Sequence, residues 1–124
     1  MVLGAAFLMV NGNDPEYANQ NILVLLVDPS EHSPGPGAVD FAFVVELENY
    51  SVSNLTTIYP TGPGLGVHPT AAPNMEMNNI KIKYLYLHDA LWDVPLNEGT
   101  KNAQEIVEYN KGIKTNSVVI IRPE

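Results

Sequence analysis

In the stretch NILVLLVDPSEHSPGPGAVDFAFVVEL, residues 21–47, two apolar runs flank a loop rich in Pro, Gly and Ser. An unbroken apolar run that stops at Asp28 is typical of a strand buried on both faces of a sheet. The second run is rich in β-forming residues and contains Asp40. Strand ends beside a Gly-rich loop are where α/β sheets place ligands, so both carboxylates are candidate site residues.

The segments downstream of this stretch predict further strands and one helix. Residues 51–59 follow a polar turn and are expected to pair with 38–48 as a hairpin. Residues 60–79 contain too much Pro and Gly for regular structure and predict a long loop. The remaining expected elements are a strand or extended segment at 81–87 and a strand at 117–122.

The one clear helix is expected at 98–111. Asn97 is its expected N-terminal cap and Gly112 its C-terminal cap. Ala103, Ile106 and Val107 are expected to form its core stripe, with Asn110 as a further candidate. The order of elements predicts an α/β fold, with this helix packed on a mixed sheet of about five strands.

The N-terminus is an apolar segment, MVLGAAFLMV, followed by a polar linker up to residue 20. Ten helical residues at about 1.5 Å each reach only halfway across the hydrocarbon core of a bilayer. Three interpretations stay open: the trimmed end of a membrane anchor, a helix or strand packed on the core, or a segment through which copies of the chain form a homo-oligomer. Residues 21–124 are expected to form a single domain.

Composition excludes several classes of function. The 124 residues carry a formal net charge of -8. Such an acidic excess repels phosphate backbones, so nucleic acid is not an expected partner. The chain has no Cys, which excludes thiolate metal sites and thiol nucleophiles.

Two tripeptides, NYS at Asn49 and NLT at Asn54, fit the N-glycosylation pattern. They favour an extracytoplasmic location slightly, since such tripeptides also arise by chance.

The serial order of motifs resembles the LytR-CpsA-Psr domain family. The family's first strand ends in an Asp, as at Asp28, and its second begins around another Asp, as at Asp40. Ile58-Tyr59-Pro60 falls where the family has an Ile-Pro motif. LHDALWD (87–93) falls where it has a His/Asn-Ala-Tyr stretch, and residues 103–121 resemble its helix, Gly-Ile and following strand.

The resemblance implies an extracytoplasmic, cell-surface domain, anchored by an upstream membrane segment, that attaches glycopolymers by phosphotransfer. The implied partner is a glycan linked to a polyprenyl phosphate carrier, and the implied cofactor is Mg²⁺ held by Asp28 and Asp40. In this register the chain looks like a shortened, archaeal-type member of the family, and its abrupt ends predict a truncated domain.

The chain departs from the family pattern at its phosphate-binding positions. Ala38 stands where an Arg is expected two residues before Asp40, and Thr61-Gly62 replaces the Arg-Asp that follows the Ile-Pro motif. Arg122 is the only Arg in the chain. Bidentate guanidinium contacts are the usual means of phosphate recognition, and here they are missing.

Each candidate site residue also has a structural interpretation. Asp28 and Asp40 either share a hard divalent cation or form turn and loop hydrogen bonds. His88 is a candidate catalytic base, or with Asp89 a satisfied polar pair. A metal site formed by His88, Asp89 and Asp93 is a weaker alternative. His68, next to a Pro, is expected to be a surface or turn residue.

Two hypotheses of function follow. The first is a domain similar to LytR-CpsA-Psr proteins, acting on surface glycans with Asp28, Asp40 and His88 at its site. The second is a non-enzymatic, self-assembling surface module that uses the apolar N-terminus or the loop at 60–79.

Overall fold

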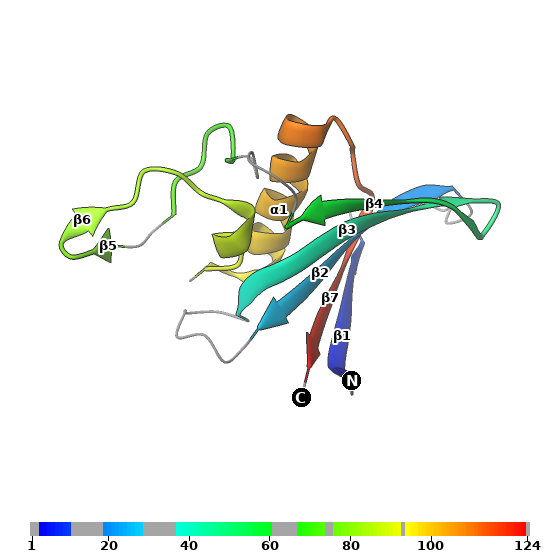
Figure 1. The fold of residues 1–124 in the computed structure, drawn as a ribbon, viewed down its shortest axis with the longest axis horizontal. Helices are drawn as coiled ribbons and strands as arrows, with labels where there is room; N and C mark the ends of the chain where they lie inside the picture. Colours follow the sequence, from blue (N-terminus) through cyan, green and yellow to red (C-terminus); the bar gives the residue numbers. More distant parts are fainter. Residues whose placement is uncertain are drawn as a thin grey trace.

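Figure 1 shows a computed structural model of the chain, which describes residues 3–10, 19–28, 37–60, 67–73, 76–92 and 94–123. A five-stranded sheet carries one long helix on one face. The strands of this sheet are β1 (Leu3–Val10), β2 (Gln20–Asp28), β3 (Ala38–Glu48), β4 (Ser51–Tyr59) and β7 (Ser117–Pro123).

The sheet is mixed. Its strand order is β1-β7-β2-β3-β4. The central strands β2 and β7 run parallel, and every other neighbouring pair is antiparallel. The α/β fold with a mixed sheet and one helix, predicted from the sequence, is therefore confirmed.

The apolar start of the chain forms an edge strand. β1 pairs antiparallel with β7 from Leu3↔Pro123 to Val10↔Ser117. The segment 3–10 thus belongs to the same sheet as the strands formed by residues 20–59 and 117–123.

The helix α1 (Leu96–Lys111) begins earlier than expected. Pro95 precedes it with φ -55° and an extended ψ of 145°, and its carbonyl oxygen accepts the N–H groups of Glu98 and Gly99. The prediction that Asn97 caps the helix is wrong, because Pro95 already sets the entry geometry one turn before Gly99. The predicted C-terminal cap is confirmed: Gly112 adopts φ 69° and its N–H donates to Glu108 O.

The core lies between α1 and one face of the sheet, called the helix face. Leu23, Leu25 and Val27 of β2 are at most 2% exposed. Because side chains alternate along a strand, their even-numbered neighbours point to the opposite face, called the outer face. From α1 the predicted stripe meets the core, with Ala103, Ile106 and Val107 also at most 2% exposed.

The segment predicted as a strand at 81–87 is mostly not one. Two strands of two residues each, β5 (Glu76–Met77) and β6 (Ile80–Lys81), form a small hairpin that projects from the body of the molecule (Figure 1). The 3-10 helix η1 (Leu87–Asp89) follows. Alternation of side chains alone does not make a strand. Among the described residues after Lys81, only Tyr86 gains a bridge, to Val67, before the chain turns into η1.

Candidate functional site

The two predicted carboxylates lie on adjacent strands at the same end of the sheet. Asp28 is the last residue of β2 and stands opposite Ala38. The register then shifts, so that Val27 faces Val39 while Leu26 faces Phe41. Asp40 is therefore the extra residue of a β-bulge. Such bulges redirect a side chain and are over-represented beside functional sites.

Neither carboxylate belongs to the core. Val27 and Val39 lie on the helix face and are 2% and 0% exposed. Val27 directly precedes Asp28 in the chain, and Val39 directly precedes Asp40. Asp40 is exposed and Asp28 is partly exposed. Asp28 stands opposite Ala38, two residues before Asp40, so the two carboxylates occupy neighbouring positions on adjacent strands.

His88 is the third predicted residue at this end. Its Nδ1 lies 2.8 Å from Val39 O, and because a carbonyl only accepts, Nδ1–H is the donor. The neutral ring therefore carries its lone pair at Nε2. Val39 immediately precedes Asp40, so this hydrogen bond ties His88 to the start of β3, next to the bulge.

Tyr59, at the end of β4, adjoins this histidine. The two ring centroids are 6.2 Å apart with an interplanar angle of 38°. Sequence reasoning placed Tyr59 in a family motif but gave it no role in the site. The site region thus draws on the end of β2, the start of β3, the end of β4 and η1.

Asp89 stands beside His88 in a half-buried position. Burial raises the pKa of the Asp89 carboxyl above 3.8, while the neighbouring His88 opposes that shift. A carboxyl that holds its proton more firmly is a poorer ligand for a cation. Asp89 is therefore better suited to the satisfied polar pair than to metal ligation.

Metal ligation is limited to pairs in the part of the chain that the structure covers. No group of three or more His, Cys, Asp or Glu residues that could hold a metal occurs among the described residues. Asp93 lies outside them, so the alternative site of His88, Asp89 and Asp93 is not described. Two carboxylates fit Mg²⁺, which keeps several waters and takes substrate phosphates as further ligands. Ala38, opposite Asp28, contributes no cationic side chain.

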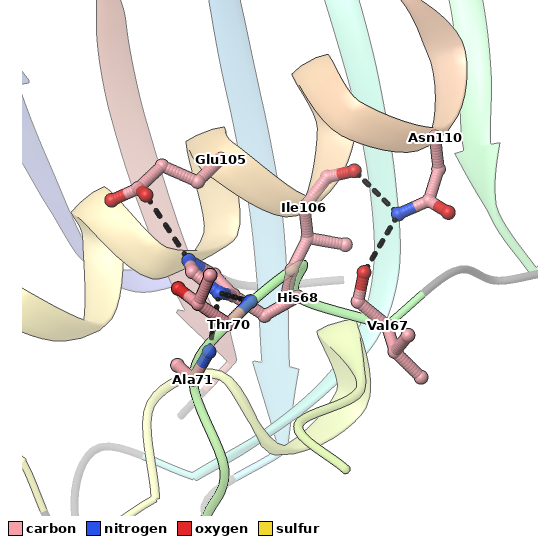
Figure 2. Close-up of polar contacts among 7 residues, drawn as sticks. All are labelled: Val67, His68, Thr70, Ala71, Glu105, Ile106 and Asn110. Atoms are coloured by element: carbon pink, nitrogen blue, oxygen red, sulfur yellow. Dashed lines mark hydrogen bonds and ion pairs between the residues drawn. The ribbon is translucent and has the colours of Figure 1, made fainter.

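His68 lies in a different place and has a different role (Figure 2). It was predicted to be a surface or turn residue; it forms a turn, but it is only 6% exposed. Its Nδ1 accepts the backbone N–H groups of Thr70 at 3.1 Å and Ala71 at 2.8 Å. Nε2 therefore carries the proton and donates to Glu105 Oε2 at 3.1 Å. The two bonds to Nδ1 close the turn, and the bond to Glu105 fastens it to α1.

A second contact fastens the same loop. Asn110 Nδ2 donates to Val67 O at 3.1 Å and to Ile106 O at 2.8 Å (Figure 2). Asn110 was a candidate for the core stripe, but it is exposed. Its amide instead joins α1 to the loop near His68. The two fastened points hold the loop along the helix.

The fold and this strand end define a small α/β domain with a pair of carboxylates where β2 ends and β3 begins. A family model described as "Protein of unknown function (DUF4012)" matches residues 18–124, so the chain belongs to the DUF4012 family. Comparisons with curated proteins and with solved structures found no match. Within the described residues, no helix has the length and apolarity needed to cross a membrane.

Proposed function

We propose that this chain is a domain similar to LytR-CpsA-Psr proteins, with Mg²⁺ held between Asp28 and Asp40. It acts outside the cytoplasm, at the cell surface, on a glycan linked to a polyprenyl phosphate carrier. The observation that supports this proposal most is that Asp28 and Asp40 lie on adjacent strands at one end of the sheet, where His88 is hydrogen-bonded to Val39 O next to Asp40. Asp28 and Asp40 are 12 residues apart in the sequence, and His88 follows Asp40 by 48 residues.

Each residue has a distinct task in this proposal. The paired carboxylates hold the cation, and Mg²⁺ supplies charge neutralisation and orientation of the phosphate groups. His88 accepts the proton of the attacking hydroxyl at Nε2, because Nδ1–H is committed to Val39 O. Ala38 and Thr61 stand where the family has cationic residues. Without those guanidinium groups, the cation provides a larger share of the phosphate binding.

A binding experiment tests the proposed cation site. Calorimetry with geranyl pyrophosphate in the presence of Mg²⁺ should give binding that disappears when EDTA replaces the metal. Asp28→Asn and Asp40→Asn should each weaken this binding by about tenfold or more, equivalent to 1.4 kcal/mol. Glu98→Gln, at an exposed carboxylate in the first turn of α1, is the matched control and should bind like the wild type. Equal binding in all variants, or binding independent of Mg²⁺, would overturn the proposal.

A second variant separates binding from proton transfer. His88→Gln can still donate a hydrogen bond to Val39 O but cannot accept a proton near neutral pH. It should retain binding of geranyl pyrophosphate. With a donor in which a sugar is attached to geranyl pyrophosphate, it should lose transfer of the sugar phosphate to an acceptor hydroxyl, a step that breaks the pyrophosphate bond and releases geranyl phosphate. If His88→Gln transfers as fast as the wild type, another group is the base.

A further inference from the structure

The outer face of the sheet is predominantly apolar among the described residues. Its polar members are Gln20, Thr57 and Ser117, with Asp28 and Asp40 at one end. The strand registers place its residues in cross-strand rows. The apolar members of these rows are Ile22, Val24, Leu26, Phe41, Phe43, Val45, Leu47, Val52, Leu55, Val119 and Ile121. Phe41 and Phe43 contact each other edge to face, with ring centroids 5.9 Å apart. When one face of a largely antiparallel sheet is left to solvent, its residues are normally polar rather than apolar.

The distribution of polar and apolar residues on the β3–β4 hairpin indicates that another molecule covers the outer face. Figure 1 shows this hairpin extending past α1. On the helix face of this hairpin, the residues near α1, such as Val44, are part of the core. The residues that lie past α1 are polar. There Asn54 Nδ2 donates to Glu46 Oε2 at 2.6 Å. A strand surface that faces water is expected to become polar in this way.

On the outer face the same hairpin does not become polar. Val45 pairs with Leu55 and Leu47 pairs with Val52. Leu55 is 57% exposed and Val52 63% exposed, and no described element packs over them. Phe41, near the other end of β3, is 37% exposed. Between these two ends the apolar side chains are partly exposed, and Val24 is only 7% exposed. Exposed apolar side chains at both ends of one face mark it as a candidate interaction surface.

We propose that a second copy of this chain covers the outer face, with the two sheets packed face to face. Strands spaced about 4.8 Å apart make five strands roughly 24 Å wide, and nine residues at about 3.3 Å make β2 about 30 Å long. The resulting area of roughly 700 Å² is close to the ~800 Å² that each partner buries in a stable interface. Two such sheets pack about 10 Å apart and interdigitate their side chains.

Charge sets the orientation of the two copies. The outer-facing carboxylates among the described residues, Asp28 and Asp40, lie at one end of the face. A two-fold axis that runs the strands of the two copies antiparallel separates these carboxylates. Val52 and Leu55 lie at the other end, with Leu55 opposite Val45, five residues along β3 from Asp40, or about 16 Å. Variants there therefore test the dimer without altering the proposed cation site.

Mass measurement tests the dimer. Light scattering at high micromolar concentration should give twice the monomer mass of 13.6 kDa for the wild-type chain. The double variant Val52→Glu/Leu55→Glu should return to the monomer mass, because four buried carboxylates would oppose association. Both side chains are more than half exposed in the single chain, so the monomer should fold normally. Tyr109→Glu, at a 63% exposed residue of α1, is the matched control and should remain dimeric.

Thiol labelling provides a second readout at the same surface. The chain has no Cys, so Leu55→Cys and Tyr109→Cys each introduce a single thiol. The alkylation rate of Leu55→Cys should fall as protein concentration rises, while that of Tyr109→Cys should stay constant. A wild-type chain that remains monomeric overturns the proposal. So does a dimer that persists in the double glutamate variant, since its interface would then lie elsewhere.

Discussion

Asp89 is the carboxyl whose environment has a definite consequence for stability. Its pKa is raised above 3.8, chiefly by burial, and His88 opposes that rise. The folded chain therefore binds a proton at Asp89 more tightly than the unfolded chain does. The free energy of unfolding consequently falls as pH rises from 3.8 through the folded pKa, and the loss persists above it.

Asp89→Asn removes this loss. We expect the variant to have a higher free energy of unfolding than the wild type above the folded pKa, and a flatter pH profile in the acid range. Urea denaturation at a series of pH values measures both. Parallel profiles for variant and wild type would show that burial of Asp89 is not coupled to folding. Glu108→Gln, at an exposed carboxylate of α1, is the control.

Gly99 is the second residue with a measurable packing requirement. A Cβ at this position would lie 2.8 Å from Leu91 Cδ2 and 3.2 Å from both Ala90 O and Leu91 Cα. Two of these atoms are backbone and cannot move aside cheaply. Gly99→Ala should therefore lower the free energy of unfolding by about 1–3 kcal/mol, although Ala is the better helix former. Lys101→Ala, exposed on the same helix, should be nearly neutral, and thermal denaturation compares the two.

For single residues, the sequence shows which side chains could take part in a site. It does not show the contacts or the burial of those side chains in the fold. Asp28 and Asp40 were recognisable because each interrupts an apolar run. The bulge that makes Asp40 the extra residue was not, since it depends on the register between β2 and β3. The burial of His68 was equally hidden. Its partner Glu105 is 37 residues away in the sequence, and no periodic pattern connects them.

At the scale of elements, the fastening of the loop to α1 depends on one side chain. His68 accepts two backbone N–H groups and donates to Glu105, so it satisfies three polar groups at once. His68→Ala leaves these groups without their partner and should cost about 1–3 kcal/mol. Amide exchange should also accelerate at Thr70 and Ala71, whose N–H groups lose their acceptor.

Glu105→Gln is the matched control for this contact. A Gln side-chain oxygen still accepts from His68 Nε2–H, and the two amide bonds to Nδ1 are untouched. The loss of stability should be smaller than for His68→Ala, and exchange at Thr70 and Ala71 should stay slow. If both variants behave alike, the hydrogen bond between His68 and Glu105, rather than the two bonds to Nδ1, holds the loop.

Elements with a strong internal pattern were predictable, and those that depend on neighbours were not. β2, β3, β4 and β7 follow apolar or alternating runs, and α1 has a core stripe that ends at Gly112. The segment 81–87 alternates just as clearly, yet past Lys81 it is mostly not a strand. Leu85 and Leu87 are buried at 4% and 1%, while Tyr84 and Tyr86, predicted on the opposite side, are exposed. A strand needs a neighbouring strand to pair with. Among the described residues of this segment past Lys81, only Tyr86 has such a pairing.

At the scale of the whole molecule, the two faces of the sheet have separate uses. α1 and η1 cover the helix face, and the buried apolar side chains of this face are part of the core. The outer face keeps an apolar surface for a second copy, and the two carboxylates lie at one end of it. With a net charge of -8, the chain is also suited to attract a divalent cation.

Paramagnetic broadening by Mn²⁺ tests the claim that Asp28 and Asp40 share one cation. Mn²⁺ prefers the same oxygen ligands as Mg²⁺ and broadens amide signals near its site. Titration of the wild-type chain should first broaden the amides of Asp28, Val39 and Asp40, and excess Mg²⁺ should restore them. The effect should vanish in Asp28→Asn and in Asp40→Asn. Broadening that begins instead around Glu46 and Glu48, or that survives both substitutions, would contradict the claim.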